Sequence, residues 1–199
     1  MKNKFIVIFF GWLALLFIQC NNNDVQLPKQ RMYPRVIFPE KSYTVFDSSY
    51  CNFTFKYPTY TKILKDAFIF EGKPSDNCWF NIHDAKLNYT IHCSYYPIDK
   101  TMNMTKMIND AFYIAGKHNT KANFRKETLI KNSHGVEGLY FDIEGPVASP
   151  VQFFLTDGTS HFFRASLYFN AKVNPDSTDI ILKFVKSDID TLIQTFHWK

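Results

Sequence analysis

The chain has 199 residues, of which 23 are basic and 18 are acidic, so its formal net charge is +5. This mild excess of positive charge does not indicate a nucleic-acid-binding protein, and an aromatic content of 18% excludes a disordered chain. A chain of this length buries enough surface for one domain with a single core, without help from a metal.

The first residues have the layout of a secretory signal peptide. Lys2 and Lys4 precede residues 5–18, which are apolar apart from Gly11. This run is shorter than the roughly 20 apolar residues that a membrane-spanning helix needs. We therefore predict that residues 1–19 are a signal peptide and not a permanent anchor.

Cys20 follows the apolar run directly, and the four residues after it, 21–24, are polar. This arrangement is typical of a bacterial lipoprotein, in which the cysteine becomes the acylated first residue. The alternative is an ordinary signal peptide beside an incidental cysteine, since Gln19 stands where such sites usually carry a small residue. We predict lipidation at Cys20, a lipidated and proline-containing tether over residues 20–40, and one globular domain over residues 41–199.

Short runs rich in aromatic and β-branched residues follow the tether. They lie at residues 42–46, 52–58 and 78–98, and they predict β-strands. The third run is long enough for a hairpin, which we expect to turn near residues 83–86.

Three cysteines remain beyond Cys20, and an oxidising compartment favours one disulfide among them. We favour a bond between Cys51 and Cys78 because each stands at the start of a predicted strand. Cys93 alternates with apolar neighbours and is expected to be a small core residue. The sequence alone leaves the connectivity open.

A helical pattern begins at Met104 and continues to Lys117. Its apolar residues recur at spacings of three and four and predict an amphipathic helix. They are Met107, Ile108, Ala111, Phe112 and Ala115.

Residues 138–145 and 151–169 alternate between apolar and other positions and predict three antiparallel strands. The pair Asp157-Gly158 divides the second segment into a hairpin. We interpret the odd-numbered positions of all three strands as one core-facing side. The even-numbered positions then form a mixed, partly covered face that contains Tyr140, Asp142, Glu144, Gln152, Phe154, Arg164, Ser166 and Tyr168.

The C-terminal segment predicts a second amphipathic helix, with start signals at residues 175–177. Its apolar stripe consists of Ile181, Phe184, Val185, Ile189, Leu192, Ile193 and Phe196. Two helices among antiparallel strands predict an α+β fold in which both main helices pack on the sheet. By analogy, this order of elements is similar to that of a PsbP-like α/β/α sandwich.

Candidate chemical groups are few. Asp142 and Glu144 share one side of a predicted strand, as two acid–base carboxylates would in an envelope hydrolase. A cross-strand ion pair with Arg164 is the simpler interpretation. His83 and His92 approach each other across the predicted hairpin, but two histidines without a third ligand do not indicate a metal site. We predict no catalytic residue, no metal and no cofactor.

Several uncommon strings together resemble the gliding motility lipoprotein GldD family of the Bacteroidota, from about Pro28 to Lys199. They are PKQRMYPRVIFPEKSY, FTFKYPTY, CWFNI, TIHCSYYPI, KHNTKA, GLYFDIEGPVASPVQFFLTDGTSHFFRASLYF and DIDTLIQTFHWK. The resemblance implies a cell-envelope lipoprotein that is needed for gliding and linked to type IX protein secretion. It also implies a non-catalytic role in assembly or stabilisation, with other gliding or secretion proteins of the envelope as partners.

We expect the lipid anchor to hold the domain on the periplasmic side of the envelope, with the outer membrane favoured over the inner membrane. The expected interaction surface comprises Tyr140, Asp142, Glu144, Arg164, Tyr168 and the C-terminal Trp198. The alternative function is binding of a glycan or peptidoglycan fragment by the aromatic-lined face, which a pocket beside Tyr140 and Tyr168 would favour.

Overall fold

The computed structural model describes residues 35–65, 78–100, 102–171 and 173–199. The expected signal peptide, Cys20 and most of the expected tether lie outside these residues. The contacts place Arg35–Lys199 in one compact unit, so residues 35–40 belong to the folded body. Among the described residues, no helix is both long enough and apolar enough to span a membrane.

Seven strands form one antiparallel sheet in the order β3-β4-β5-β9-β8-β7-β6. They are β3 (Lys62–Lys65), β4 (Phe80–Asp84), β5 (Tyr89–Pro97), β6 (Phe124–Lys131), β7 (Glu137–Glu144), β8 (Val151–Thr156) and β9 (His161–Phe169). A smaller sheet has the order β1-β2-β10, from β1 (Tyr43–Asp47), β2 (Phe53–Pro58) and β10 (His197–Trp198). The helices among the described residues are α2 (Met104–Gly116) and α3 (Pro175–Thr195).

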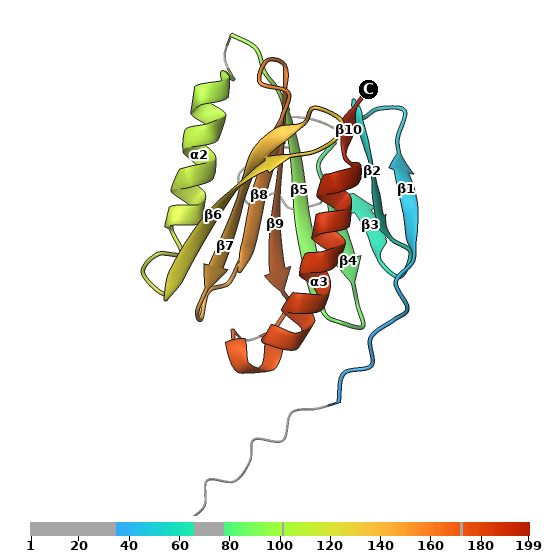
Figure 1. The fold of residues 1–199 in the computed structure, drawn as a ribbon, viewed down its shortest axis with the longest axis vertical. Helices are drawn as coiled ribbons and strands as arrows, with labels where there is room; N and C mark the ends of the chain where they lie inside the picture. The colour runs from blue at the N-terminus through green and yellow to red at the C-terminus, as the bar shows by residue number, and fades with distance from the viewer. Residues whose placement is uncertain (1–34, 66–77, 101, 172) are drawn as a thin grey trace, which may run out of the picture. The chain divides into compact units, whose positions relative to one another are not determined.

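The helices cover opposite faces of the large sheet (Figure 1). Helix α3 and the small sheet pack on one face, where Phe53, Phe163 and Phe196 belong to the larger apolar core. Helix α2 packs on the other face, where Met107, Ala111 and Ala115 contact a second apolar core. The predicted α+β fold with two main helices packed on an antiparallel sheet is therefore confirmed.

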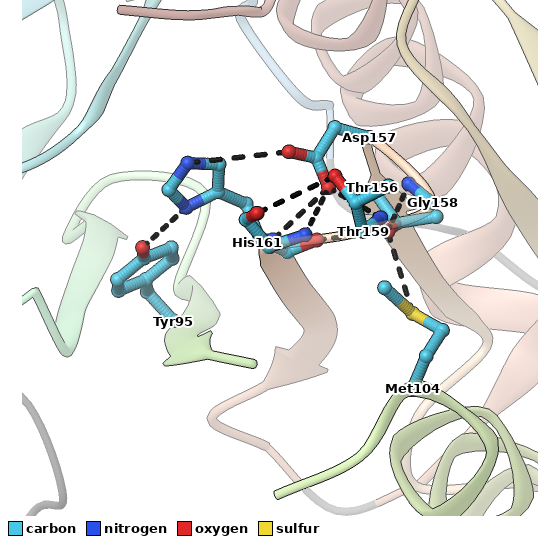
Figure 2. A network of polar contacts seen from close by, with 8 residues as sticks. Tyr95, Met104, Thr156, Asp157, Gly158, Thr159 and His161 are labelled. Carbon is cyan, nitrogen blue, oxygen red and sulfur yellow. Dashed lines mark hydrogen bonds and ion pairs between the residues drawn. The ribbon is translucent and has the colours of Figure 1, made fainter. Parts of the chain in front are cut away.

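The hairpin between β8 and β9 turns at the predicted Asp157-Gly158 pair. Gly158 has a φ of +79°, a conformation that glycine adopts without steric cost. The Asp157 carboxylate accepts hydrogen bonds from three backbone N–H groups, those of Thr159, Ser160 and His161 (Figure 2). Burial alone would raise the pKa of Asp157, but these three hydrogen bonds hold the pKa below its ordinary value.

The register of the sheet corrects one prediction about its faces. Strands β8 and β9 pair Phe153 with Ala165, so their odd-numbered side chains share a face. Strands β7 and β8 instead pair Tyr140 with Phe153, so an even position of β7 lies beside an odd position of β8. The prediction that odd positions of all three strands share one face is therefore wrong for β7.

The reason lies in the connection between β7 and β8. Alternation fixes which residues of one strand share a side, but the connecting loop fixes the register between strands. Here Leu139, Phe141 and Ile143 face α2, whereas Tyr140, Asp142 and Glu144 lie on the side of α3. Relative to the prediction, the pairing of β7 with β8 is shifted by one residue, so each side chain of β7 lies on the face opposite to the one predicted.

The structure contains a disulfide between Cys51 and Cys78, both of which are buried. Cys93 is 1% exposed and lies in the core beside the α3 face of the sheet. The hairpin between β4 and β5 turns at residues 85–88, slightly later than the predicted 83–86. The Asp84 carboxylate accepts hydrogen bonds from the backbone N–H groups of Lys86 and Leu87 in this turn.

Candidate functional site

A groove of about 630 Å³ lies at the end of the sheet where β7 and β9 finish and α3 begins. Its lining includes three of the predicted interaction residues, Asp142, Glu144 and Tyr168. Helix α3 contributes Lys183 and Lys186 to the same groove. The lining also contains apolar residues of the loop between β7 and β8, so the groove combines both signs of charge with apolar surface.

Asp142 is held by an ion pair at the edge of this groove. Both of its carboxylate oxygens accept hydrogen bonds from Nζ of Lys186, at 2.8 and 2.7 Å. The predicted ion pair between Asp142 and Arg164 is wrong, because the change of register between β7 and β8 puts the two side chains on opposite faces of the sheet.

Glu144 and Tyr168 reach the groove from different strands. Glu144 is the exposed last residue of β7 and shares its side with Asp142, as predicted. Tyr168 lies near the end of β9 on the opposite face, where its ring contacts His92 edge-on at a centroid distance of 5.4 Å. The groove therefore draws its lining from both faces of the sheet.

Tyr140 is separate from the groove lining. Its ring stacks on Phe153 at a centroid distance of 6.4 Å, at the edge of the core beneath α3. Burial raises the pKa of Tyr140, and the charges of Asp142 and Asp190 raise it further. Tyr140 is thus a packing residue in this structure.

Arg164 lies on the face that carries α2. Its guanidinium donates hydrogen bonds to Oε1 of Gln152 at 3.4 Å and to Oγ of Ser166 at 3.5 Å. It lines a second, smaller groove beside α2. Arg164 therefore lies apart from the groove that Asp142, Glu144 and Tyr168 line.

Trp198 packs at the other end of the sheet, beside the β8–β9 turn. Its ring stacks on His161 at a centroid distance of 5.1 Å. Nδ1 of His161 is hydrogen-bonded to the hydroxyl of Tyr95 at 2.6 Å, and Nε2 lies 4.0 Å from Oδ2 of Asp157 (Figure 2). Trp198 therefore closes a polar and aromatic cluster and does not lie beside Asp142 or Arg164.

The two histidines considered as metal ligands each contact a neighbouring polar side chain. His83 is hydrogen-bonded through Nδ1 to Thr90 at 3.0 Å, and His92 through Nδ1 to Asn81 at 2.7 Å. Within the described ranges, no group of three or more His, Cys, Asp or Glu side chains is arranged to hold a metal ion.

A buried carboxylate on α3, Asp188, escaped the sequence analysis. It is 2% exposed and accepts hydrogen bonds from Lys41 and Tyr43, each at 2.8 Å, and from Tyr60. Lys41 also lies over the ring of Phe184, 4.1 Å from its centroid. The sequence could have revealed Asp188, because it is an acidic residue within the apolar stripe of this helix.

This network predicts a loss of stability at alkaline pH. Burial, followed by the hydrogen bond to Asp188, raises the pKa of Tyr60 far above its ordinary value of 10. The unfolded chain releases the phenol proton above pH 10 while the folded chain retains it, so stability present below pH 10 falls as the pH rises further. Denaturant unfolding on either side of pH 10 should show this fall.

The Tyr60→Phe variant provides the control for that experiment, because phenylalanine has no proton to release. Its free energy of unfolding should decline less steeply above pH 10 than that of the unchanged protein. Equal slopes for the two proteins would contradict the assignment to Tyr60.

The chain is similar to a known protein family and, at low identity, to a solved structure. A solved structure of PsbP from the cyanobacterium Synechocystis is 11% identical, with a TM-score of 0.46, and the match covers 81% of this chain and 95% of that chain. No curated protein is significantly similar to the chain. Residues 23–198 match the family described as gliding motility lipoprotein GldD. The chain therefore belongs to the gliding motility lipoprotein GldD family, whose members have a role in gliding motility.

Proposed function

We propose that this protein acts in gliding by non-catalytic contact with other proteins of the gliding and type IX secretion machinery. Its working surface is the groove around Glu144 and Tyr168. The observation that carries this proposal is the composition of that groove, which places both signs of charge beside apolar residues from two strands, a loop and a helix. Surfaces of this mixed kind suit protein partners, since a polar rim around apolar residues is the usual anatomy of an interface.

The ion pair of Asp142 favours contact over acid–base chemistry. A hydrolase that used Asp142 and Glu144 would need both carboxylates to exchange protons with a substrate. Lys186 already binds both oxygens of Asp142, so this carboxylate serves to join β7 to α3. Glu144 and Asp179 are the exposed acidic groups of the groove, and Asp179 forms an ion pair with Lys183.

Helix α3 contacts both the groove and the segment before β1 that contains Phe38 and Lys41. On one side α3 contributes Lys183 and Lys186 to the groove. On another side it binds the segment before β1, through a stack of Phe38 on Phe184 at 4.5 Å and the ion pair of Lys41 with Asp188. A partner bound in the groove would thus contact the same helix that holds the beginning of the folded body.

The proposal includes lipid attachment at Cys20 and a periplasm-facing position, with the outer membrane favoured. Membership of a lipoprotein family supports an anchored, envelope-associated protein. Confinement to the plane of the membrane raises the effective concentration of partners in the same plane, so weak contacts suffice. Fatty-acid labelling of the unchanged protein and of Cys20→Ser tests the lipid attachment. Separation of the inner and outer membranes then tests which of them holds the protein.

The central experiment is a charge reversal at the groove in a gliding strain that lacks its own copy of the protein. We expect Glu144→Lys to reduce colony spreading to the level of the strain without the protein, while the amount of protein in the envelope stays unchanged. An exposed side chain contributes little to folding, so abundance should be preserved. Measuring the export of surface adhesins in the same cells tests the link to type IX secretion.

Glu137→Lys is the matched control, since Glu137 is the exposed first residue of the same strand and lies outside the groove. Gliding should persist with this control and with Glu144→Gln, which removes acid–base capacity but keeps size and polarity. Normal spreading of the Glu144→Lys strain would refute the groove as the working surface. Loss of gliding with Glu144→Gln at normal abundance would instead favour the hydrolase.

A further inference from the structure

A second groove, of about 330 Å³, lies on the domain beside α2, between that helix and strands β5 and β9. The helix and its C-cap residue, Lys117, contribute Lys106, Asp110, Tyr113 and Lys117 at spacings of four, three and four residues. These side chains therefore follow one stripe along the helix. The groove is distinct from the one around Glu144 and has no part in the function proposed above.

The charge of this groove is predominantly positive. Lys106, Lys117 and Arg164 provide three cations, and Asp110 provides one carboxylate. In the part of the chain that the structure describes, neither lysine forms an ion pair. The positive charge of Arg164 also acts on His118, whose pKa is lowered first by burial and then by this charge. A ligand that complements this groove carries negative charge.

Aromatic rings give the groove a second property. Tyr113 is 67% exposed, and Nζ of Lys117 lies 4.8 Å from the centroid of its ring. Tyr96 faces the groove from β5. Rings beside charged groups suit a ligand that has both an apolar C–H face and an acidic group, as an acidic sugar does.

The surroundings favour a small ligand over a peptide. An extended peptide binds most readily at a free strand edge, where it gains main-chain hydrogen bonds. Strands β5 and β9 are interior strands that pair with each other and with β4 and β8, so no such edge borders this groove. A volume of about 330 Å³ is also at the lower end of the range for small-ligand sites.

A buried amide lies behind the arginine of this groove. Gln152 is 1% exposed, and its Oε1 accepts a hydrogen bond from Arg164 at 3.4 Å, whereas its Nε2 has no hydrogen-bond partner among the residues that the structure describes. Gln152 does not line the groove itself, so its contact with the proposed site runs through Arg164.

We propose that the groove beside α2 binds an acidic sugar unit, with Lys117 and Arg164 binding its carboxylate and the ring of Tyr113 contacting its C–H face. Lys106 stands about 16 Å from Lys117 along the helix and adds to the positive charge of the groove. The site would give the domain affinity for an acidic polysaccharide, independently of any protein bound at Glu144. The chemistry required of the ligand is one negative group on a ring of sugar size.

The test is an NMR titration of the purified full-length protein in detergent with glucuronic acid, and separately with glucose. Glucuronic acid should cause saturable shifts of the amides of residues 106–117, and glucose should not. Lys117→Glu should weaken binding by at least about tenfold, the effect of losing one charge-assisted contact and gaining a repulsive charge. Tyr113→Ala should weaken binding without altering the preference for the acid.

Lys126→Glu is the control for net charge, since Lys126 is an exposed residue of β6 and lies outside the groove. It should bind glucuronic acid as the unchanged protein does. The proposal is overturned if glucuronic acid causes no saturable shifts, if glucose binds equally well, or if Lys117→Glu and Lys126→Glu behave alike. Tighter binding of a triglutamate peptide than of glucuronic acid would replace the sugar by an acidic peptide.

Discussion

Replacing Asp188 by alanine is expected to lower the free energy of unfolding by about 2 to 4 kcal/mol, because each hydrogen-bonding group that loses a buried acceptor costs about 1 to 3 kcal/mol. The carboxylate is 2% exposed and holds Lys41, Tyr43 and Tyr60 together. Its removal leaves two tyrosine hydroxyls and an ammonium group without their shared acceptor. Denaturant unfolding followed by circular dichroism measures the change.

Asp179→Ala is the matched control on the same helix. Asp179 forms an ion pair with Lys183 at 2.8 Å, but its side chain is 58% exposed. Such a pair contributes at most about 0.5 kcal/mol. If Asp188→Ala costs no more than Asp179→Ala, then the segment before β1 is not held on α3 in the way the structure shows.

The second large effect is expected from the disulfide. Replacing Cys51 and Cys78 together by alanine should lower the free energy of unfolding by about 3.5 kcal/mol, as estimated from the chain entropy of the closed loop. The bond joins positions 27 residues apart, so its loss allows the unfolded chain many more conformations. Unfolding of the oxidised protein and of the double variant gives the difference.

Cys93→Ala separates the disulfide from the effect of a small core change. Cys93 is buried and lies outside the disulfide, so this substitution should cost less than the double variant and should leave the response to reductant unchanged. Addition of reductant should destabilise the unchanged protein and have little effect on the double variant. A double variant as stable as the oxidised protein would show that the bond adds nothing to stability.

The main elements of the fold followed from local patterns in the sequence. The spacing of Met107, Ala111 and Ala115 predicted α2, and the Asp157-Gly158 pair predicted the hairpin between β8 and β9. The strands at the two edges of the sheet, β3 and β6, gave no such signal. Both are largely exposed and rich in charged residues, so they lack the apolar alternation that marks a half-buried strand.

The candidate site could be predicted only in part, because it depends on contacts between distant segments. Alternation correctly placed Asp142 and Glu144 on one side of β7. It did not reveal that Arg164 lies on the opposite face, because the register between β7 and β8 has no local signature. The pairing of Asp142 with Lys186 joins residues 44 positions apart and required the tertiary fold.

The contacts of Phe38 and Lys41 with α3 shorten the part of the chain that can act as a tether between the domain and the membrane. Since the folded body begins at Arg35, only fourteen residues, 21–34, lie between it and the proposed acylated cysteine. Covalent geometry allows about 3.4 Å per residue, so the fifteen steps from Cys20 to Arg35 can extend over no more than about 50 Å. With Cys20 acylated as proposed, Arg35 stays within this distance of the bilayer surface, so a partner of the groove must reach a domain that is held close to the membrane.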